Sequence, residues 1–111
     1  MSYTISYYNE KVQAEINALP LGIRAKYAAL ASRMMASGAN LGEPHTKAFG
    51  DGLFELRLKA QEGIGRVFYC TLIGKRIVIL HSFVKKTQKT PTNELNIATL
   101  RLKEVKSDAN T

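Results

Sequence analysis

Apolar residues recur at two different spacings along the chain, and these spacings predict its helices and strands. Residues 3–8 are rich in β-forming side chains and predict a short strand. A helix follows Asn9, a favourable N-cap residue, and ends at Pro20. Its apolar stripe consists of Val12, Ile16 and Leu19. A second helix is expected over residues 21–37, with Gly38 after its last turn, so the two helices form a hairpin.

The second half of the chain changes to the alternating pattern of strands. Residues 39–52 contain three glycines and a proline and are expected to form a loop. Three strands follow, over residues 53–59, 65–72 and 75–83, joined by hairpin-sized gaps. The third of these is apolar on both faces, as expected of a central strand. After a polar, basic segment at residues 84–90, Pro91 opens a last helix with an apolar stripe.

The element order is therefore β-α-α-β-β-β-α, which predicts an α+β fold. We expect an antiparallel sheet, with the N-terminal helical hairpin and the C-terminal helix packed on one of its faces. A chain of 111 residues is long enough for one domain and too short for two ordinary ones. We therefore expect a single domain over residues 1–111, with residues 107–111 as a frayed tail.

The composition of the chain indicates in which cellular compartment the protein is expected. The sequence contains neither the apolar run of about 20 residues that spans a membrane nor a recognisable signal peptide, so no membrane is expected as a partner. Cys70 is the only cysteine, which excludes an internal disulfide, and its apolar neighbours predict a buried thiol. These features together predict a cytoplasmic protein.

The net charge of +7 is concentrated in the second half of the chain. Residues 53–111 contain eleven basic and five acidic side chains, and eight of the basic ones lie within residues 57–89. Such a concentration of positive charge attracts polyanions, of which nucleic acid is the commonest in a cytoplasm. A solvated basic face, or a docking surface for an acidic protein, would explain the same charges.

Several of these cations are expected to meet on one face of the sheet. Arg57 and Lys59 are two residues apart on a strand and project from the same side. Arg66 opens the neighbouring strand, and Lys85 and Lys86 follow the third. RNA cleavage by intramolecular transesterification needs cations for the charge that builds on phosphorus, together with a base and an acid. The alternative is that these side chains only keep an exposed face soluble; the side chain of Arg66 is not expected to be needed for folding.

The histidines are weaker candidates. His81 shares a strand face with Phe83 and Lys85 and is either a core histidine or a proton-transfer group. His45 lies beside Pro44 in the expected loop and is interpreted as an ordinary surface residue. The two histidines and Cys70 are too far apart in sequence to form a metal-binding pattern, so no metal or other cofactor is expected.

Three segments of the second half resemble a known family. They are Gly52-Leu53-Phe54-Glu55-Leu56-Arg57, Arg66-Val67-Phe68-Tyr69, and residues 79–91, which read ILHSFVKKTQKTP. Over about residues 50–105 the chain resembles the phage-type HigB-like branch of the RelE/ParE toxin superfamily, and the N-terminal part matches in layout only. The resemblance implies a RelE-like fold and a type II toxin that cleaves mRNA, usually on the ribosome. It also implies a cognate antitoxin, in this branch generally with a helix-turn-helix domain.

The resemblance also assigns residues. Its implied catalytic residues are Arg57, Lys59, Arg66 and Lys86, and its implied RNA-binding residues are Lys85, Lys89 and His81. RelE-like enzymes often have a tyrosine or histidine shortly after the position of Lys86, and this chain has Thr87-Gln88-Lys89-Thr90 there instead. The general base is therefore open among Lys59, Lys86 and His81. A toxin of this fold that acts on a protein target such as gyrase, and a non-catalytic RNA- or antitoxin-binding module, are the alternative functions.

Overall fold

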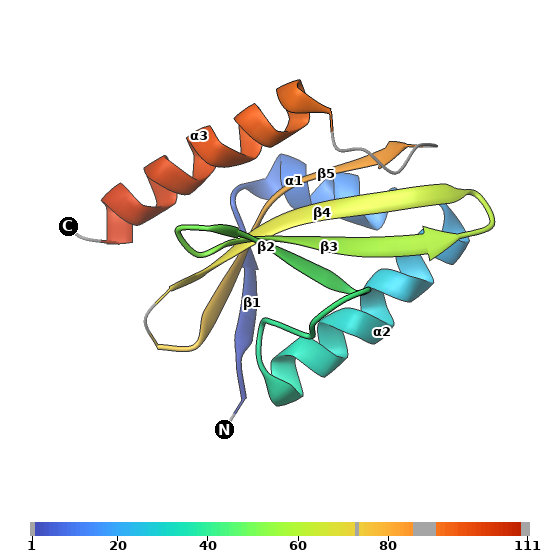
Figure 1. Ribbon diagram of the computed structural model, residues 1–111, viewed down its shortest axis with the longest axis horizontal. Coiled ribbons are helices and arrows are strands. Elements are labelled where there is room, and N and C mark those ends of the chain that lie inside the picture. The colour runs from blue at the N-terminus through green and yellow to red at the C-terminus, as the bar shows by residue number, and fades with distance from the viewer. Residues whose placement is uncertain (1, 73, 86–90, 110–111) are drawn as a thin grey trace.

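A five-stranded sheet with helices on both sides forms the protein (Figure 1). The computed structural model describes residues 2–72, 74–85 and 91–109. In chain order the elements are β1 (Thr4–Tyr7), α1 (Glu10–Asn17), α2 (Leu21–Ser37), β2 (Thr46–Gly50), β3 (Leu53–Ala60), β4 (Gly63–Leu72), β5 (Arg76–Lys85) and α3 (Thr92–Ala109). None of the helices within the described ranges has the length and apolarity needed to cross a membrane.

Local sequence signals fix the two N-terminal helices as predicted. The Asn9 side chain accepts a hydrogen bond of 2.8 Å from the Val12 backbone N–H, which caps the start of α1. The second helix ends at Gly38, whose φ of 114° lies in a region that side chains disfavour. Both predicted helices, and the break between them at Pro20, are confirmed.

The strand order across the sheet is β1-β5-β4-β3-β2. The pairs β2–β3, β3–β4 and β4–β5 are antiparallel, and β5 is a central strand as predicted. The expectation of a wholly antiparallel sheet is wrong, because β1 pairs parallel to β5, with Thr4 opposite Arg76. Parallel pairing needs a long connection between the two strands, and here that connection includes α1, α2 and three other strands.

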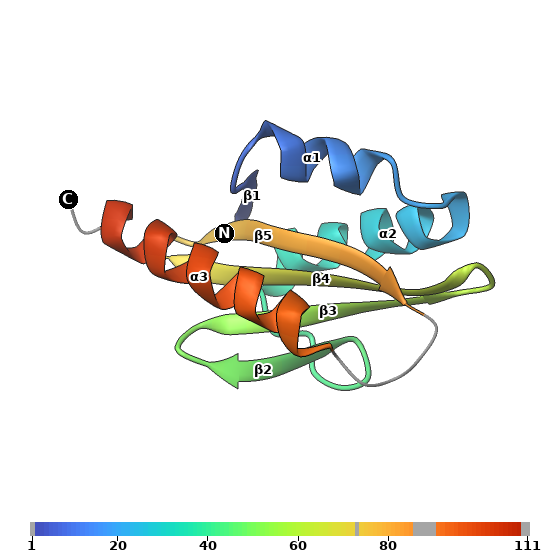
Figure 2. The same cartoon turned by 90° about the horizontal axis from the view of Figure 1, so that it is seen from above.

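Two separate apolar clusters show that helices cover both faces of the sheet, which corrects the expectation of helices on one face. Helices α1 and α2 pack on one face over residues such as Leu56, Leu58 and Tyr69. Helix α3 packs on the other face, where Ala98 and Leu102 meet a cluster that includes Phe68, Cys70 and Val78. Figure 2 shows the sheet between these two layers. The predicted burial of the Cys70 thiol is confirmed.

Most element boundaries lie within two residues of the predictions, and the following differences matter for the sheet and the last helix. Residues 46–50, expected in a loop, form β2, because Lys47 and Ala48 pair with residues of β3. Strand β5 continues to Lys85, so two residues of the expected basic segment belong to the sheet. Helix α3 continues to Ala109, so residues 107–109 of the expected frayed tail are helical.

Candidate functional site

Register across the sheet places four of the predicted cations on one face. Arg57 on β3 lies opposite Arg66 on β4, which in turn lies opposite Phe83 on β5. One step further along the strands, Lys59 lies opposite Ile64, which lies opposite Lys85. Directly opposed residues of neighbouring strands share a face, with Cβ atoms roughly 5 Å apart. The four cations therefore form two adjacent rows on the face that α3 covers in part.

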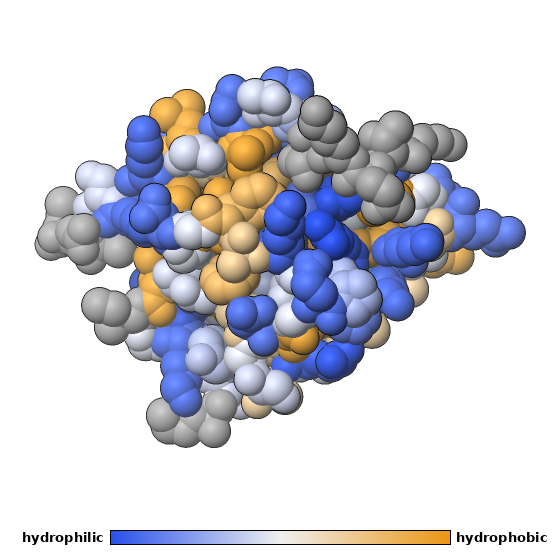
Figure 3. Space-filling model, in the orientation of Figure 1, coloured by the Kyte–Doolittle hydropathy of each residue, from blue (hydrophilic) through white to orange (hydrophobic). Residues whose placement is uncertain are grey.

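A pocket of about 320 Å³ opens at these rows. Its lining residues are Lys26, Pro44, His45, Arg57, Lys59, Ile64 and Arg66. In the view of Figure 3, hydrophilic side chains gather over the β3–β4 part of this face, beside a hydrophobic strip along α3. The sequence-predicted cations Arg57, Lys59 and Arg66 thus meet around one hollow, and Lys85 lies in the row beside them.

A buried carboxylate holds the two arginines in place. Nη1 of Arg66 lies 2.6 Å from Oε1 of Glu55, and the side chains of both residues are almost completely buried. Nε of Arg57 lies 3.6 Å from the same oxygen, while its Nη1 lies 3.1 Å from the exposed carboxylate of Glu43. The expectation that the side chain of Arg66 is not needed for folding is wrong, because this guanidinium neutralises a carboxylate inside the protein.

Lys85 joins this group of cations from β5, on the side of β4 away from β3. Its side chain is only 9% exposed, and its Nζ has no hydrogen-bond partner in the described part of the chain. Burial lowers the pKa of the Lys85 ammonium; repulsion from Arg66 and Arg57 lowers it further, partly opposed by Glu55. The described cations of the site outnumber its two carboxylates, Glu43 and Glu55, so the site has a surplus of positive charge for an anion.

The remaining sequence candidates fall elsewhere. Nε2 of His81 lies 2.7 Å from Oε1 of Glu94, and its ring stacks on Phe83 at 6.0 Å, so this side chain ties α3 to β5. His81 does not line the cationic pocket. Lys86 and Lys89 lie outside the described residues.

Sequence reasoning missed three parts of this site. Glu55 lies two residues before Arg57 on β3 and therefore shares its face, but its burial follows only from the register with Arg66. Lys26 comes from α2 and lines the same pocket, which no local pattern indicates. His45, interpreted as a surface residue, is half-buried in the pocket wall, and its backbone oxygen accepts a hydrogen bond of 2.8 Å from the Arg57 N–H.

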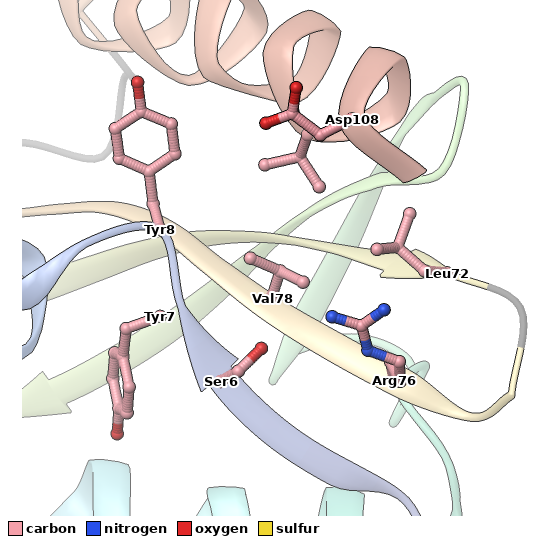
Figure 4. A pocket seen from close by; sticks show the side chains of 8 residues that line it. Ser6, Tyr7, Tyr8, Leu72, Arg76, Val78 and Asp108 are labelled. Carbon is pink, nitrogen blue, oxygen red and sulfur yellow. The ribbon is translucent and has the colours of Figure 1, made fainter. Parts of the chain in front are cut away.

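A second hollow, of about 260 Å³, lies between β1, β5 and the end of α3 (Figure 4). Its lining residues are Ser6, Tyr7, Tyr8, Leu72, Arg76, Val78, Val105 and Asp108. Arg76 on β5 and Asp108 on α3 both line it and carry opposite charges. It therefore lacks the excess of one charge that distinguishes the first pocket.

Metal-binding side chains are not clustered within the described residues. No group of three or more histidine, cysteine, aspartate or glutamate side chains is placed there to hold a metal ion. The positive charge at the first pocket instead comes from guanidinium and ammonium groups.

Comparison with known proteins identifies relatives of the chain. Residues 14–103 match the family described as Phage derived protein Gp49-like (DUF891). A search of curated proteins finds no match. The chain is similar to a double-mutant form of the E. coli toxin RelE in the free state, with 15% identity and a TM-score of 0.67, over 91% of this chain and 98% of that one.

A second similar structure is the archaeal RelE–RelB complex from Pyrococcus horikoshii OT3. The match has 19% identity and a TM-score of 0.59, over 76% of this chain and 96% of that one. These two likenesses confirm the predicted RelE-like α+β fold.

Proposed function

The chain belongs to the Phage derived protein Gp49-like family, and from this membership, its RelE-like fold and its cationic pocket we propose that it is the toxin of a type II toxin–antitoxin system. The proposed activity is metal-independent cleavage of mRNA, on the ribosome, in the cytoplasm. The observation that carries the proposal is the meeting of Arg57, Lys59 and Arg66 around one pocket, with the buried ammonium of Lys85 beside it.

Two guanidinium groups suit the charge that develops during the reaction. Attack of the 2′-oxygen on phosphorus places extra negative charge on the non-bridging oxygens, and fixed cations stabilise it without having to reorganise. Glu55 holds the guanidinium of Arg66 and lies near that of Arg57 before any substrate binds. Arginine also matches phosphate geometry with two parallel N–H donors. We assign Arg57 and Arg66 to this role.

The lysines take the remaining tasks. As the P–O5′ bond breaks, the leaving oxygen needs a proton, and the Lys85 ammonium is a suitable donor because burial lowers its pKa. Lys59, exposed at the pocket, holds the scissile phosphate, and Lys86, to which the family resemblance assigns a catalytic role, assists it. Lys89 is kept as an RNA-binding residue, whereas His81 is not, because it is paired with Glu94 and does not line the pocket. The products are a 2′,3′-cyclic phosphate and a 5′-hydroxyl.

An antitoxin partner is part of the proposal. A similar structure shows an archaeal RelE in complex with RelB. The net charge of +7 on this chain favours a partner that presents acidic side chains, since opposite charges speed association and disfavour wrong partners. The HigB-like resemblance adds a helix-turn-helix domain to that partner.

Expression and cleavage assays test this function. Induction of the chain alone in a bacterium is expected to arrest growth and deplete intact mRNA. The purified protein is expected to cut mRNA on programmed ribosomes and to leave cyclic phosphate or 3′-phosphate ends. Intact transcripts at confirmed expression, or products with 3′-hydroxyl ends, would contradict the proposal.

Two single-charge variants separate catalysis from simple attraction of RNA. Arg57→Ala is expected to lower the single-turnover rate at saturating substrate by on the order of 10²-fold, as for loss of one preorganised donor. Lys75→Ala removes a cation that lies 5.6 Å above the Tyr3 ring, away from the pocket, and is expected to weaken binding slightly in a salt-dependent way. Equal losses that low salt restores in both variants would reduce the cluster to an electrostatic surface.

A further inference from the structure

His45 lies in line with the two arginines across the sheet. The hydrogen bond from the Arg57 N–H to the His45 oxygen continues the β2–β3 ladder one residue beyond Thr46, which lies opposite Leu56. His45 therefore stands opposite Arg57, which stands opposite Arg66. Neighbouring strands are roughly 4.8 Å apart, so an imidazole and two guanidiniums follow one another at strand spacing.

The face on which His45 projects follows from its neighbour. Thr46 is 2% exposed, and its hydroxyl hydrogen-bonds Asn40 and the Gly42 N–H on the side of the α1–α2 core. Successive residues of an extended segment point to opposite faces. The His45 side chain consequently projects to the opposite face, where it lines the cationic pocket.

An imidazole has a property that no other residue type in this lining offers. Lysine and arginine side chains ordinarily remain charged at neutral pH and serve as donors, whereas imidazole ordinarily changes charge between pH 5 and 8. Proline and isoleucine have no titratable group. We propose that His45 is the general base of the proposed RNA cleavage and accepts the proton of the attacking 2′-hydroxyl.

The proposed step balances as follows in atoms and protons. A nitrogen of His45 takes the 2′-hydroxyl proton as the O2′–P bond forms, and the P–O5′ bond breaks. The Lys85 ammonium gives a proton to O5′, and exchange with solvent returns both side chains to their starting states. Strand order places His45 beside β3, the arginines on β3 and β4, and Lys85 on β5. Base and acid thus lie on opposite sides of the phosphate-binding arginines, as in-line displacement requires.

Other charged groups face His45, and a test by pH must allow for them. They are Glu43 from its own loop, Lys26 from α2, Arg57 and Lys59 from β3, and Arg66 from β4. These residue types ordinarily keep one charge between pH 6 and 8. The pH dependence of the wild type is therefore interpreted only by comparison with that of His45→Gln, in which Lys85 and these other groups are unchanged.

The inference rests on the proposed RNA cleavage, and the experiment separates the two. Single-turnover cleavage of mRNA on programmed ribosomes is measured from pH 5.5 to 8 for the wild type, His45→Gln, His45→Ala and His81→Gln. For the wild type we expect the rate to rise with pH and level off. His45→Gln is expected to lose about 10²- to 10⁴-fold at saturating substrate, with unchanged affinity and a flat pH profile.

Rescue and a matched histidine substitution complete the design. Added imidazole is expected to restore part of the activity of His45→Ala and none of the activity of Arg57→Ala. His81→Gln makes the same chemical change at the other histidine, and its rate is expected to keep the rise with pH. Thermal melts identify any loss of folding, which is not expected for a half-buried side chain in the pocket wall.

Each other outcome has a defined meaning. If the wild type leaves mRNA intact, both the function and this inference fail. If the wild type cuts mRNA and His45→Gln keeps its rate and pH profile, the function stands and the role of His45 is wrong. Loss of the pH dependence in His81→Gln instead would move the base to that residue and also overturn the inference.

Discussion

Replacing Arg66 by methionine is expected to destabilise the fold severely, whatever its effect on the proposed activity. The guanidinium is 1% exposed and lies 2.6 Å from the carboxylate of Glu55, which is fully buried. Arg66→Met keeps an unbranched side chain of similar length but leaves that carboxylate without its nearest positive charge. Removing one partner of a buried pair typically costs about 3–5 kcal/mol.

Because the unfolding entropy of so short a chain is small, that loss of unfolding free energy is expected to lower the melting temperature strongly. An unfolding entropy of about 2.1 cal/mol/K per residue gives roughly 0.23 kcal/mol/K for 111 residues. A loss of about 3–5 kcal/mol thus lowers Tm by roughly 13–21 °C. Lys59→Ala removes an exposed cation from the same sheet face and is expected to change stability by no more than about 0.5 kcal/mol.

A double-mutant cycle tests whether the lost pairing is the cause. Glu55→Leu alone removes the buried carboxylate that lies 2.6 Å from the guanidinium of Arg66, and is expected to be destabilising as well. The double variant Glu55→Leu/Arg66→Met removes both charges and is expected to be more stable than either single variant. Calorimetry and urea unfolding measure all four proteins. If Arg66→Met melts within 3 °C of the wild type, or the two effects simply add, our account of this pair is wrong.

Three further predictions follow from Lys85, from Cys70 and from the charge at the pocket. Because burial, and then repulsion from Arg66, lower the pKa of Lys85, the unfolded chain binds more protons, and this group favours folding increasingly as pH rises toward the ordinary lysine value of about 10.4. Lys85→Met is therefore expected to raise Tm near neutral pH, with the gain shrinking in melts at higher pH; a constant difference would contradict this. Burial raises the pKa of the Cys70 thiol to about 11, so labelling followed by mass spectrometry is expected to be slow in the folded wild type and faster in Ala98→Asp, which disrupts the packing of α3; equal rates would exclude protection by α3. Because guanidinium and ammonium groups supply the charge at the phosphate in the proposed mechanism, EDTA is expected to leave cleavage intact when the magnesium needed by the ribosome is maintained, and a full loss would contradict that mechanism.

Elements with a local signal were predictable from the sequence. The N-cap at Asn9 and the stop at Pro20 define α1, and the alternation of residues 53–59 defines β3. Strand β2 has no such signal, because it is short, lies among turn-forming residues, and exists through its pairing with β3. The face covered by α3 and the parallel pairing of β1 likewise depend on contacts between distant parts of the chain.

The candidate site also has parts that local sequence predicts and parts that depend on contacts between strands. Alternation alone placed Arg57 and Lys59 on one face, and the structure brings Arg66 into contact with that face. The burial of Arg66 against Glu55 was not predictable, because it depends on which residues of β3 and β4 stand opposite one another. His45 was missed for a related reason, since its place beside Arg57 depends on the unpredicted strand β2.

The pairing of β1 with β5 has a consequence for how a new chain acquires its structure during synthesis. Thr4 is translated about 70 residues before its partner Arg76. Strand β1 therefore has no sheet partner while the two helices and three strands that precede β5 are synthesised. Pairing between such distant segments is slow to form. Lys85, at the end of β5, is translated later still. A chain truncated before β5 would lack both the partner of its first strand and one side of the cationic site, so the proposed toxic activity belongs to chains translated beyond that point.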